Sequence, residues 1–270
     1  MNLLFTLDIN YIEPLKKCIC SIIRFPVKDG WDIYIITADL LNFRGFARDA
    51  ERHDNVRIHL IQADTEIFKA FPETFKYTRV VYFRIFAASV LPENLDRILY
   101  LDPDIIVINS LDQLYNMEFD NSYYVACSHT KGALTEINRV RLGIKKDVPY
   151  INSGVILMNL KLLRKEQTLK AVFDYVRKRG RYFILPDQDI ITAVYGDKVK
   201  LVDTYKYNLS DRLIAVNNVN PTNDYIDLKW VKNNAVIIHY YGDNKPWRAR
   251  YIGILDVFYN EVAAFTQSDN

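Results

Sequence analysis

Two aspartates one residue apart interrupt an apolar stretch of the sequence. Asp102 and Asp104 flank Pro103, with the apolar run 98–101 before them and the run 105–108 after them. Such runs are typical of strands buried in a sheet, and Pro103, which cannot donate to a strand ladder, predicts a break between two short strands. Two close carboxylates repel each other unless a cation or a proton lies between them. We therefore expect a hard divalent ion here, although Asp and Pro are also common in simple turns.

A second group of chemically capable residues lies late in the chain. His239 closes the apolar run 235–238 and is followed by Gly242 and Lys245. A histidine at a strand end is commonly a packing residue, but beside two aspartates its imidazole can be a third ligand of the same metal. Gly242 would let the backbone approach a phosphate, and Lys245 would supply positive charge to it.

Polar residues also follow the first predicted strand, where the chain turns into a helix. Asp8 and Asn10 lie at this turn, and a helix N-terminus favours anions such as the phosphates of a nucleotide. Either residue could instead simply cap the helix. The chain has no G-x-G-x-x-G and no G-x-x-x-x-G-K-[ST] sequence, which argues against NAD-binding Rossmann enzymes and P-loop NTPases.

Three further polar segments are surrounded by apolar residues. Residues 152–154 open a buried strand, and either a structural turn or a backbone corner beside a ligand would explain them. Residues 187–189 begin a predicted helix, where acids suit the macrodipole, but a cap needs one acid and this segment has two. Arg84 lies in an apolar stretch, so its charge requires an anionic partner, which is either an aspartate or a ligand phosphate.

The elements that must position these residues alternate between strands and helices. This alternation indicates an α/β protein with a largely parallel sheet. Residues 210–232 are polar and weakly periodic, and we interpret them as a long surface loop. The predicted strands are 3–7, 33–37, 56–61, 98–101, 123–127, 155–159 and 236–239, and the predicted helices are 11–24, 40–52, 79–90, 162–179, 187–195 and 251–265.

The composition is that of a globular protein without a nucleic-acid partner. Half of the 270 residues are apolar and a quarter are charged, and 35 basic residues nearly balance 33 acidic ones. The three cysteines form no metal or disulfide pattern, which favours reduced thiols inside the cell. The N-terminal apolar run is too short for a signal peptide, and no run is long enough to span a membrane. We expect a soluble, cytoplasmic protein.

Taken in order, these segments resemble the family 8 retaining glycosyltransferases, which include bacterial lipopolysaccharide galactosyl- and glucosyltransferases and glycogenin. The resemblance runs from residue 3 to about residue 248. It implies a GT-A fold, with a mixed, mainly parallel sheet flanked by helices, in a single domain over residues 1–270. Its donor part would be about 1–110, its acceptor and catalytic part about 111–250, and its closing helix 251–265. It rests on Leu-Asp102-Pro-Asp104, Asn152-Ser-Gly154-Val, Asp187-Gln188-Asp189 and His239-x-x-Gly242-x-x-Lys245-Pro246-Trp247.

The resemblance also implies a role for each matching residue. Asp102, Asp104 and His239 would hold Mn²⁺, or Mg²⁺ in its place, on the diphosphate of UDP-glucose or UDP-galactose. Gln188 would lie nearest the reacting carbon, and because an amide is a poor nucleophile we expect attack on the face that UDP leaves. The implied catalytic residues are Asp187, Gln188 and Lys245, and the implied donor-binding residues are Thr6, Asp8, Asn10, Tyr11, Arg84, Asp102, Pro103, Asn152, Ser153, Gly154, Gly242 and Lys245.

The acceptor would be a glycan, in the synthesis of lipopolysaccharide or another surface polysaccharide, and we expect its contacts in residues 129–148 and 210–232. A peripheral contact with the inner face of the membrane is left open, because only a short tail follows the closing helix. Three alternatives also stay open: a nucleotidyltransferase, a non-catalytic module that binds a glycan or a nucleotide-sugar, and a self-glycosylating protein.

Overall fold

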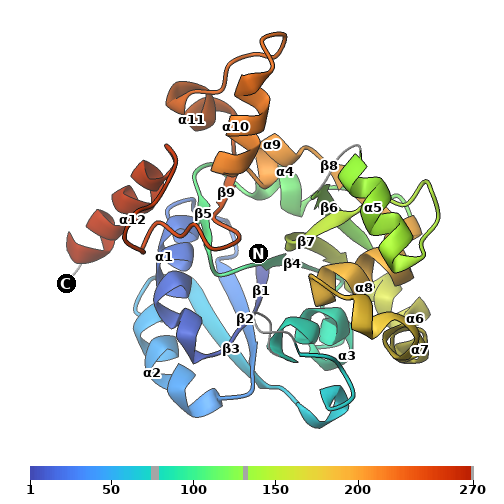
Figure 1. Cartoon of the computed structure of the whole chain (residues 1–270). Coiled ribbons are helices and arrows are strands. Elements are labelled where there is room, and N and C mark those ends of the chain that lie inside the picture. The colour runs from blue at the N-terminus through green and yellow to red at the C-terminus, as the bar shows by residue number, and fades with distance from the viewer. Residues whose placement is uncertain (74–78, 130–132, 269–270) are drawn as a thin grey trace.

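A mixed, seven-stranded sheet runs through the middle of the molecule. The computed structural model describes residues 1–73, 79–129 and 133–268, and within them the strand order is β3-β2-β1-β4-β7-β6-β8 (Figure 1). The first four of these strands are parallel, β7 is antiparallel to both of its neighbours, and β8 is parallel to β6. The strands are β1 (Asn2–Thr6), β2 (Trp31–Thr37), β3 (Val56–Gln62), β4 (Arg97–Leu101), β6 (Tyr124–Ser128), β7 (Ile151–Asn159) and β8 (Val199–Val202).

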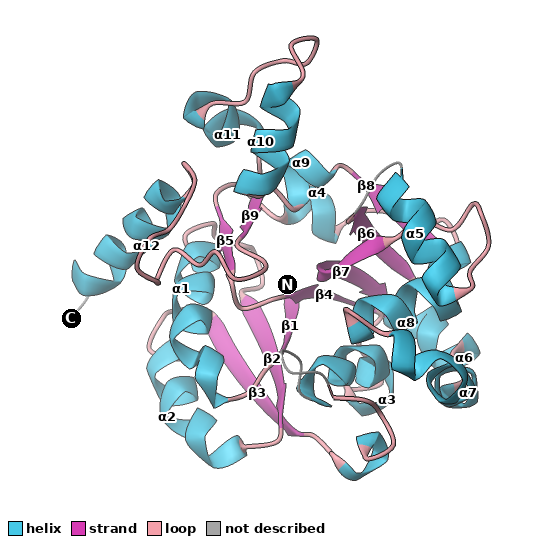
Figure 2. Cartoon of the chain, in the orientation of Figure 1, coloured by secondary structure: helices cyan, strands magenta, loops and turns pink. Residues whose placement is uncertain are grey.

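Helices cover both faces of this sheet (Figure 2). Because side chains alternate along a strand, Leu3 and Phe5 of β1 join the apolar cluster under α1 and α2, whereas Leu4 joins the cluster under α7 and α8. The longer helices are α1 (Ile12–Ile23), α2 (Leu40–Ala50), α5 (Ala133–Leu142), α6 (Leu160–Glu166), α7 (Leu169–Arg179) and α8 (Pro186–Tyr195). Short helical turns are η1 (Ile9–Tyr11), η2 (Glu66–Phe68), α3 (Ala87–Val90), α4 (Asp112–Tyr115), η4 (Gly180–Tyr182), η5 (Gly196–Lys198) and α9 (Thr204–Tyr207).

After Pro103 the chain leaves the large sheet and forms a second, smaller one. β5 (Ile105–Val107) pairs antiparallel with β9 (Ile237–His239), so that Ile105 lies opposite His239. A third apolar cluster, which includes Ile106 and Ile238, joins this small sheet to the last helices. These are α10 (Asp211–Val219), α11 (Leu228–Asn234) and α12 (Asp256–Ser268).

The structure confirms the seven predicted strands and the break at Pro103, with corrections elsewhere. β8 is missing from the prediction because its side chains are only partly buried and give a weak apolar pattern. The predicted helix 79–90 is instead a 3₁₀ helix, η3 (Arg79–Phe86), followed by one α-helical turn. Five consecutive side chains of η3 are buried, so it has no single apolar face. The predicted helix 162–179 is two helices, because Gln167 and Thr168 have extended backbones.

The interpretation of residues 210–232 as a surface loop was wrong, since α10 and α11 occupy most of this segment. Both helices begin at a capping side chain: Ser210 Oγ accepts from Leu213 N at 3.3 Å, and Asp227 Oδ1 accepts from Trp230 N at 2.7 Å. The apolar periodicity was weak because each helix buries few side chains. The closing helix is confirmed, although it begins at Asp256 rather than near residue 251.

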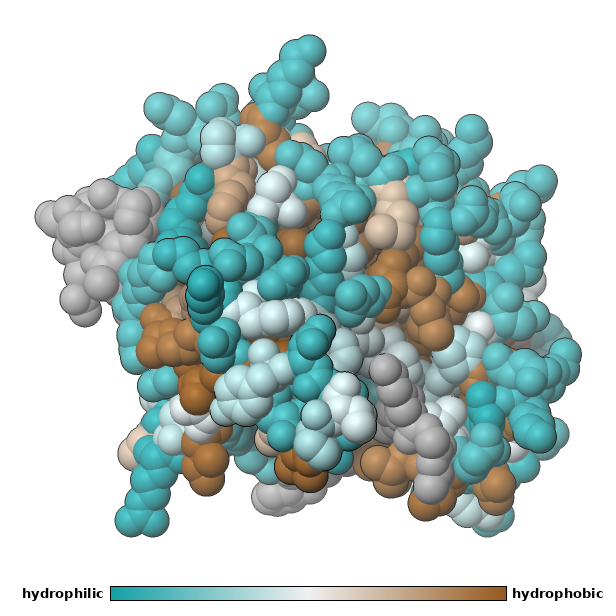
Figure 3. Space-filling view, turned by 90° about the horizontal axis from the view of Figure 1, so that it is seen from above, coloured by the Kyte–Doolittle hydropathy of each residue, from teal (hydrophilic) through white to brown (hydrophobic). Residues whose placement is uncertain are grey.

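The face seen from above is mostly hydrophilic, with apolar residues gathered in a few separate areas (Figure 3). Among the exposed apolar side chains are Val216 and Val219 of α10 and Ile252. α10 and α11 also line a cavity of about 790 Å³. No helix in the described part of the chain is both long enough and apolar enough to cross a bilayer.

Candidate functional site

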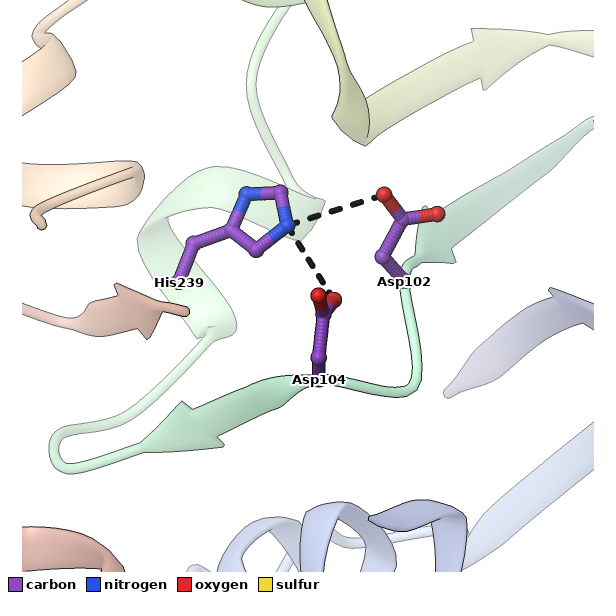
Figure 4. A group of neighbouring side chains, drawn as sticks. All are labelled: Asp102, Asp104 and His239. Atoms are coloured by element: carbon purple, nitrogen blue, oxygen red, sulfur yellow. Dashed lines mark ion pairs between the residues drawn. The ribbon is translucent and has the colours of Figure 1, made fainter. Parts of the chain in front are cut away.

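Three side chains that could bind a metal meet where the two sheets join. Asp102 follows the last residue of β4, Asp104 precedes β5, and His239 ends β9. His239 Nε2 lies 3.6 Å from Asp102 Oδ2 and 3.2 Å from Asp104 Oδ1 (Figure 4). One potential ligand atom of each residue lies within 4.8 Å of the others. The structure thus brings together the three ligands expected from the sequence.

The hydrogen bonds of His239 leave the nitrogen that faces the carboxylates without a well-formed partner. Nδ1 lies 2.7 Å from Asn208 Oδ1, which fixes Nδ1 as the protonated nitrogen. Nε2 is buried and makes no well-formed hydrogen bond to any described residue. Its lone pair therefore points at two carboxylates, which is unfavourable unless a cation or a proton lies between them. Two carboxylates and one imidazole, whose ring is held in place by Asn208, are a ligand set that fits a divalent metal ion.

Because Gly154 has no side chain, His239 and Asp102 can lie close to its α-carbon. A Cβ atom on Gly154 would lie 2.2 Å from His239 Cε1 and 2.7 Å from Asp102 Oδ2. The carbonyl of Gly154 also accepts the Asp102 N–H at 2.8 Å, which fixes the backbone at the end of β4. Residues 152–154 lie within β7 and form neither the turn nor the corner expected from the sequence, but Gly154 is a position where only glycine fits.

Lys245 is buried beside Asp104, and its ammonium group contacts that carboxylate and donates to Tyr240 O at 2.8 Å. Although burial by itself would raise the pKa of Asp104, the positive charge of Lys245 holds that pKa well below its ordinary value. Gly242 has a φ of +82° and open space around its α-carbon. Lys245 thus brings a positive charge to the candidate metal ligands, on the loop that follows β9.

Arg84 of η3 links two of the predicted site segments. Its guanidinium lies 3.0 Å from Asp102 Oδ1 and 2.9 Å from Asp187 Oδ2, and it donates to Ser153 O at 3.0 Å. It also stacks on the ring of Tyr100, 4.3 Å from the centroid. Burial disfavours the charge, yet Asp102 and its neighbours raise the pKa of Arg84 above its ordinary value. The anionic partners left open by the sequence are therefore aspartates.

The three polar side chains in the first turn of α8, those of Asp187, Gln188 and Asp189, have different partners. Burial raises the pKa of Asp187 despite its pairing with Arg84. Gln188 accepts from Ser153 N at 3.3 Å, and its amide nitrogen is buried without a well-formed hydrogen bond to any described residue. Asp189 is fully buried and pairs with Arg141. Pro186 occupies the first position of this helix, one residue before its predicted start.

An open cavity of about 380 Å³ lies beside Asp102, Asp104 and His239. Asp8, which accepts from Asn10 N at 2.9 Å and caps η1, borders this cavity, but Asn10 does not. Burial and the carboxylates of Asp104 and Asp102 raise the pKa of Tyr11, another lining residue. The cavity lining does not include the predicted site residues Asn152, Ser153, Gly154, Asp187 and Gln188. The predicted residues that line the cavity are Thr6, Asp8, Tyr11, Arg84, Asp102, Pro103, Asp104, His239, Gly242 and Lys245.

Several residues at the site were not predicted from the sequence. Asn208 orients His239, and the hydroxyl of Tyr100 donates to Asp102 Oδ1 at 2.6 Å. His129 Nδ1 lies 3.1 Å from Asn152 Nδ2, and burial, with help from Arg212, lowers the pKa of His129 to about 4. None of them belongs to a recognisable motif. In the segment 129–148, predicted to contact the acceptor, residues 130–132 lie outside the described part of the structure.

Comparisons with known proteins agree with this geometry. Residues 2–250 match the model of the family described as Glycosyl transferase family 8. The chain is 27% identical over 254 residues to the lipopolysaccharide 1,2-glucosyltransferase of Escherichia coli K12, covering 92% of this chain and 72% of the relative. It is 24% identical over 267 residues to the lipopolysaccharide 1,3-galactosyltransferase of Salmonella typhimurium LT2, covering 92% and 73%.

Solved structures show the same fold. The galactosyltransferase LgtC, crystallised with donor and acceptor sugar analogues, superposes with a TM-score of 0.78 at 21% identity. The match covers 98% of this chain and 96% of that one. A mutant of the same protein gives a TM-score of 0.79.

Proposed function

The chain belongs to glycosyl transferase family 8, and on that premise we propose that it transfers glucose or galactose from a UDP-sugar to a glycan acceptor. It has the GT-A fold that the sequence predicts. We place the reaction in the synthesis of lipopolysaccharide or another surface polysaccharide. The support for this narrower statement is the similarity to the two lipopolysaccharide transferases.

The observation that carries the proposal is the buried Nε2 of His239, which faces Asp102 and Asp104 without a well-formed hydrogen bond. These three residues would hold Mn²⁺, or Mg²⁺ in its place. When bound, such an ion supplies Lewis-acid stabilisation to the departing diphosphate. The adjoining cavity is lined by some of the residues proposed to bind the nucleotide-sugar, among them Thr6, Asp8 and Tyr11.

Positively charged side chains of the protein would also stabilise the leaving group. Departure of UDP leaves negative charge on the diphosphate, and Lys245 and Arg84 are the buried cations beside the site. In a site shielded from water their charges stabilise developing negative charge more strongly than they would in bulk solvent. Among the described residues, Gly242 has no neighbouring atom within 4 Å of where a Cβ would lie, so it would let the loop that carries Lys245 approach the phosphates.

We propose that the acceptor attacks on the face that UDP leaves. The bond between the anomeric carbon and the diphosphate oxygen breaks, a bond to the acceptor oxygen forms, and the acceptor's proton passes to the departing phosphate. The configuration is then retained without a covalent enzyme intermediate. Gln188 is an amide and a poor nucleophile, so it would orient the sugar and not attack it, with Asp187 beside it.

We propose that the chain forms one domain with three parts. These are a donor part (about 1–110), an acceptor and catalytic part (about 111–250) and a closing helix. The glycan acceptor would contact residues 129–148 and the helical segment 210–232, which lines the cavity of about 790 Å³. We also propose a cytoplasmic location, at the inner face of the membrane where the acceptor is lipid-linked. Cell fractionation, with and without the acceptor lipid, tests this placement.

The proposed function is tested by UDP release from UDP-glucose and UDP-galactose, with Mn²⁺ or with EDTA. The wild type is compared with Asp104→Ala and with the control Asp54→Ala, which changes an exposed aspartate that does not line the cavity. We expect release from one donor, requiring metal, that Asp54→Ala retains and Asp104→Ala loses by about 10³-fold. Tight binding of UDP and Mn²⁺ without release or transfer would overturn it in favour of a binding module. Intact mass after incubation with donor would reveal self-glycosylation.

A further inference from the structure

The carboxylate of Asp189 is saturated with hydrogen bonds. Arg141 Nη1 and Nη2 donate to its two oxygens at 2.8 Å each, in the bidentate fork that guanidinium and carboxylate form. The Tyr150 hydroxyl donates to Oδ1 at 2.7 Å, and the backbone N–H groups of Ile184 and Leu185 donate to Oδ2 at 2.8 and 3.2 Å. A carboxylate offers about four lone-pair directions, and these five donors fill them. Asp189 has no exposed surface.

Arg141 holds more than this carboxylate. It lies on α5, in the segment expected to contact the acceptor, and Asp189 lies on α8, 48 residues later. The same guanidinium donates to Tyr182 O at 2.7 Å and to Asn138 Oδ1 at 2.9 Å. Arg141 therefore ties α5 both to the first turn of α8 and to the loop that leads into it.

The backbone N–H groups at the entry of α8 depend on Asp189 for their hydrogen bonds. Leu185, the residue before the helix, makes no side-chain cap, and the carboxylate of Asp189 accepts the N–H groups of residues 184 and 185 in its place. Asp187 and Gln188 lie on this same turn, directed toward Arg84 and Ser153. A shift of the turn would move both of them relative to the donor sugar.

We propose that Arg141 is a positioning residue for the transfer reaction. It fixes Asp189, and through Asp189 it sets the positions of Asp187 and Gln188. The same contacts keep the Asp189 carboxylate engaged, so that it does not attack the sugar. This inference rests on the proposed function, because it assumes that Asp187 and Gln188 face the donor hexose.

The test compares Arg141→Lys with Arg164→Lys. Lysine keeps the positive charge beside Asp189 but cannot form the fork. Arg164 is a matched control: its guanidinium donates to the carbonyls of residues 88, 91, 92, 93 and 95, none of which belongs to the site. The measurements are kcat for sugar transfer, the Kd for UDP with Mn²⁺, and the melting temperature.

We expect Arg141→Lys to lower kcat about tenfold or more, because small misplacements of catalytic groups are costly. UDP lacks the hexose that Asp187 and Gln188 would contact, so its Kd should stay within about twofold of the wild-type value. A twofold change in Kd corresponds to about 0.4 kcal/mol. Arg164→Lys should lower the melting temperature while keeping kcat. Equal kcat in the two variants would overturn the inference. A wild type that releases no UDP would instead sink the proposed function itself.

A second variant separates positioning from stability. Arg141→Met leaves the buried Asp189 charge unpaired, whereas Arg141→Met with Asp189→Asn removes both charges and keeps an oxygen for the N–H groups of residues 184 and 185. We expect the double variant to recover melting temperature over Arg141→Met but to keep the low kcat. Recovery of kcat together with the melting temperature would show that Arg141 is only a counter-ion. A glycosyl adduct on Asp189 of the wild type, found by mass spectrometry, would also overturn the inference.

Discussion

The α-carbon of Gly154 faces the imidazole of His239 so closely that a methyl group on it would lie 2.2 Å from Cε1. We therefore expect Gly154→Ala to displace His239 or Asp102 and to lower the transfer rate by about 10²-fold. Mn²⁺ affinity, followed by the EPR signal of free Mn²⁺, should fall with the rate.

Gly45→Ala is the matched control for this change. Gly45 lies inside α2, and a Cβ atom there would meet nothing within 4 Å. This variant should keep full activity and gain about 0.5–1 kcal/mol of stability, since alanine is the better helix former. A Gly154→Ala enzyme that binds Mn²⁺ as tightly as Gly45→Ala does would contradict the close approach.

Asn208 should control metal affinity without touching the metal. Its side-chain oxygen lies 2.7 Å from His239 Nδ1, and it therefore sets which imidazole nitrogen is free to bind. We expect Asn208→Ala to weaken Mn²⁺ binding by about 10- to 100-fold, as loss of such supporting partners commonly does. Asn208→Asp keeps an acceptor oxygen and should bind Mn²⁺ better than Asn208→Ala. Calorimetric titrations giving the same Kd for the wild type and both variants would argue against this role.

Arg84 should contribute to stability as well as to the site. Its side chain is 7% exposed and neutralises Asp102 and Asp187, which Arg84→Met would leave without their cation. Removing one partner of a buried ion pair costs about 3 kcal/mol, measurable by urea denaturation. Arg177→Met, at a side chain that is 79% exposed, should change stability by less than about 0.5 kcal/mol. Similar losses in both variants would mean that the buried network adds nothing.

Acid should weaken the fold through Asp32, on β2. Arg57 lies 2.6 and 2.8 Å from its oxygens and His59 lies 2.9 Å away; their hydrogen bonds lower its pKa from 3.8 to about 2. The folded pKa is below the unfolded one, so this stabilisation is present above pH 4 and is lost as the pH falls through 2. We expect Asp32→Asn to remove about 1 kcal/mol at pH 7, allowing for solvent screening. Its stability should also fall less steeply from pH 4 to 2, and wild-type steepness would refute this assignment.

The meeting of Asp102, Asp104 and His239 was predictable because their chemistry and their strand positions agree. Asp102 and Asp104 flank a proline between two apolar runs, so both carboxylates had to lie at a strand end. His239 also ends an apolar run, and its pairing partner β5 begins beside Asp104. Residue type and periodicity together were sufficient for these three.

Other contacts could not be read from the sequence, because they depend on tertiary packing. Asn208 lies 31 residues from His239, and Arg141 lies 48 residues from Asp189. Nothing in the neighbouring sequence marks either residue. The helices in residues 210–232 were missed for a different reason: they bury few side chains, and the capping residues Ser210 and Asp227 were the stronger signal.

The site lies across a boundary between two separate sheets. Asp102 directly follows β4 of the large sheet, whereas Asp104 directly precedes β5 and His239 ends β9 in the small one. Any cation that these residues share is thus also a cross-link between the body of the molecule and its C-terminal third. Binding at the site and cohesion of the fold are then thermodynamically linked: whatever strengthens one strengthens the other.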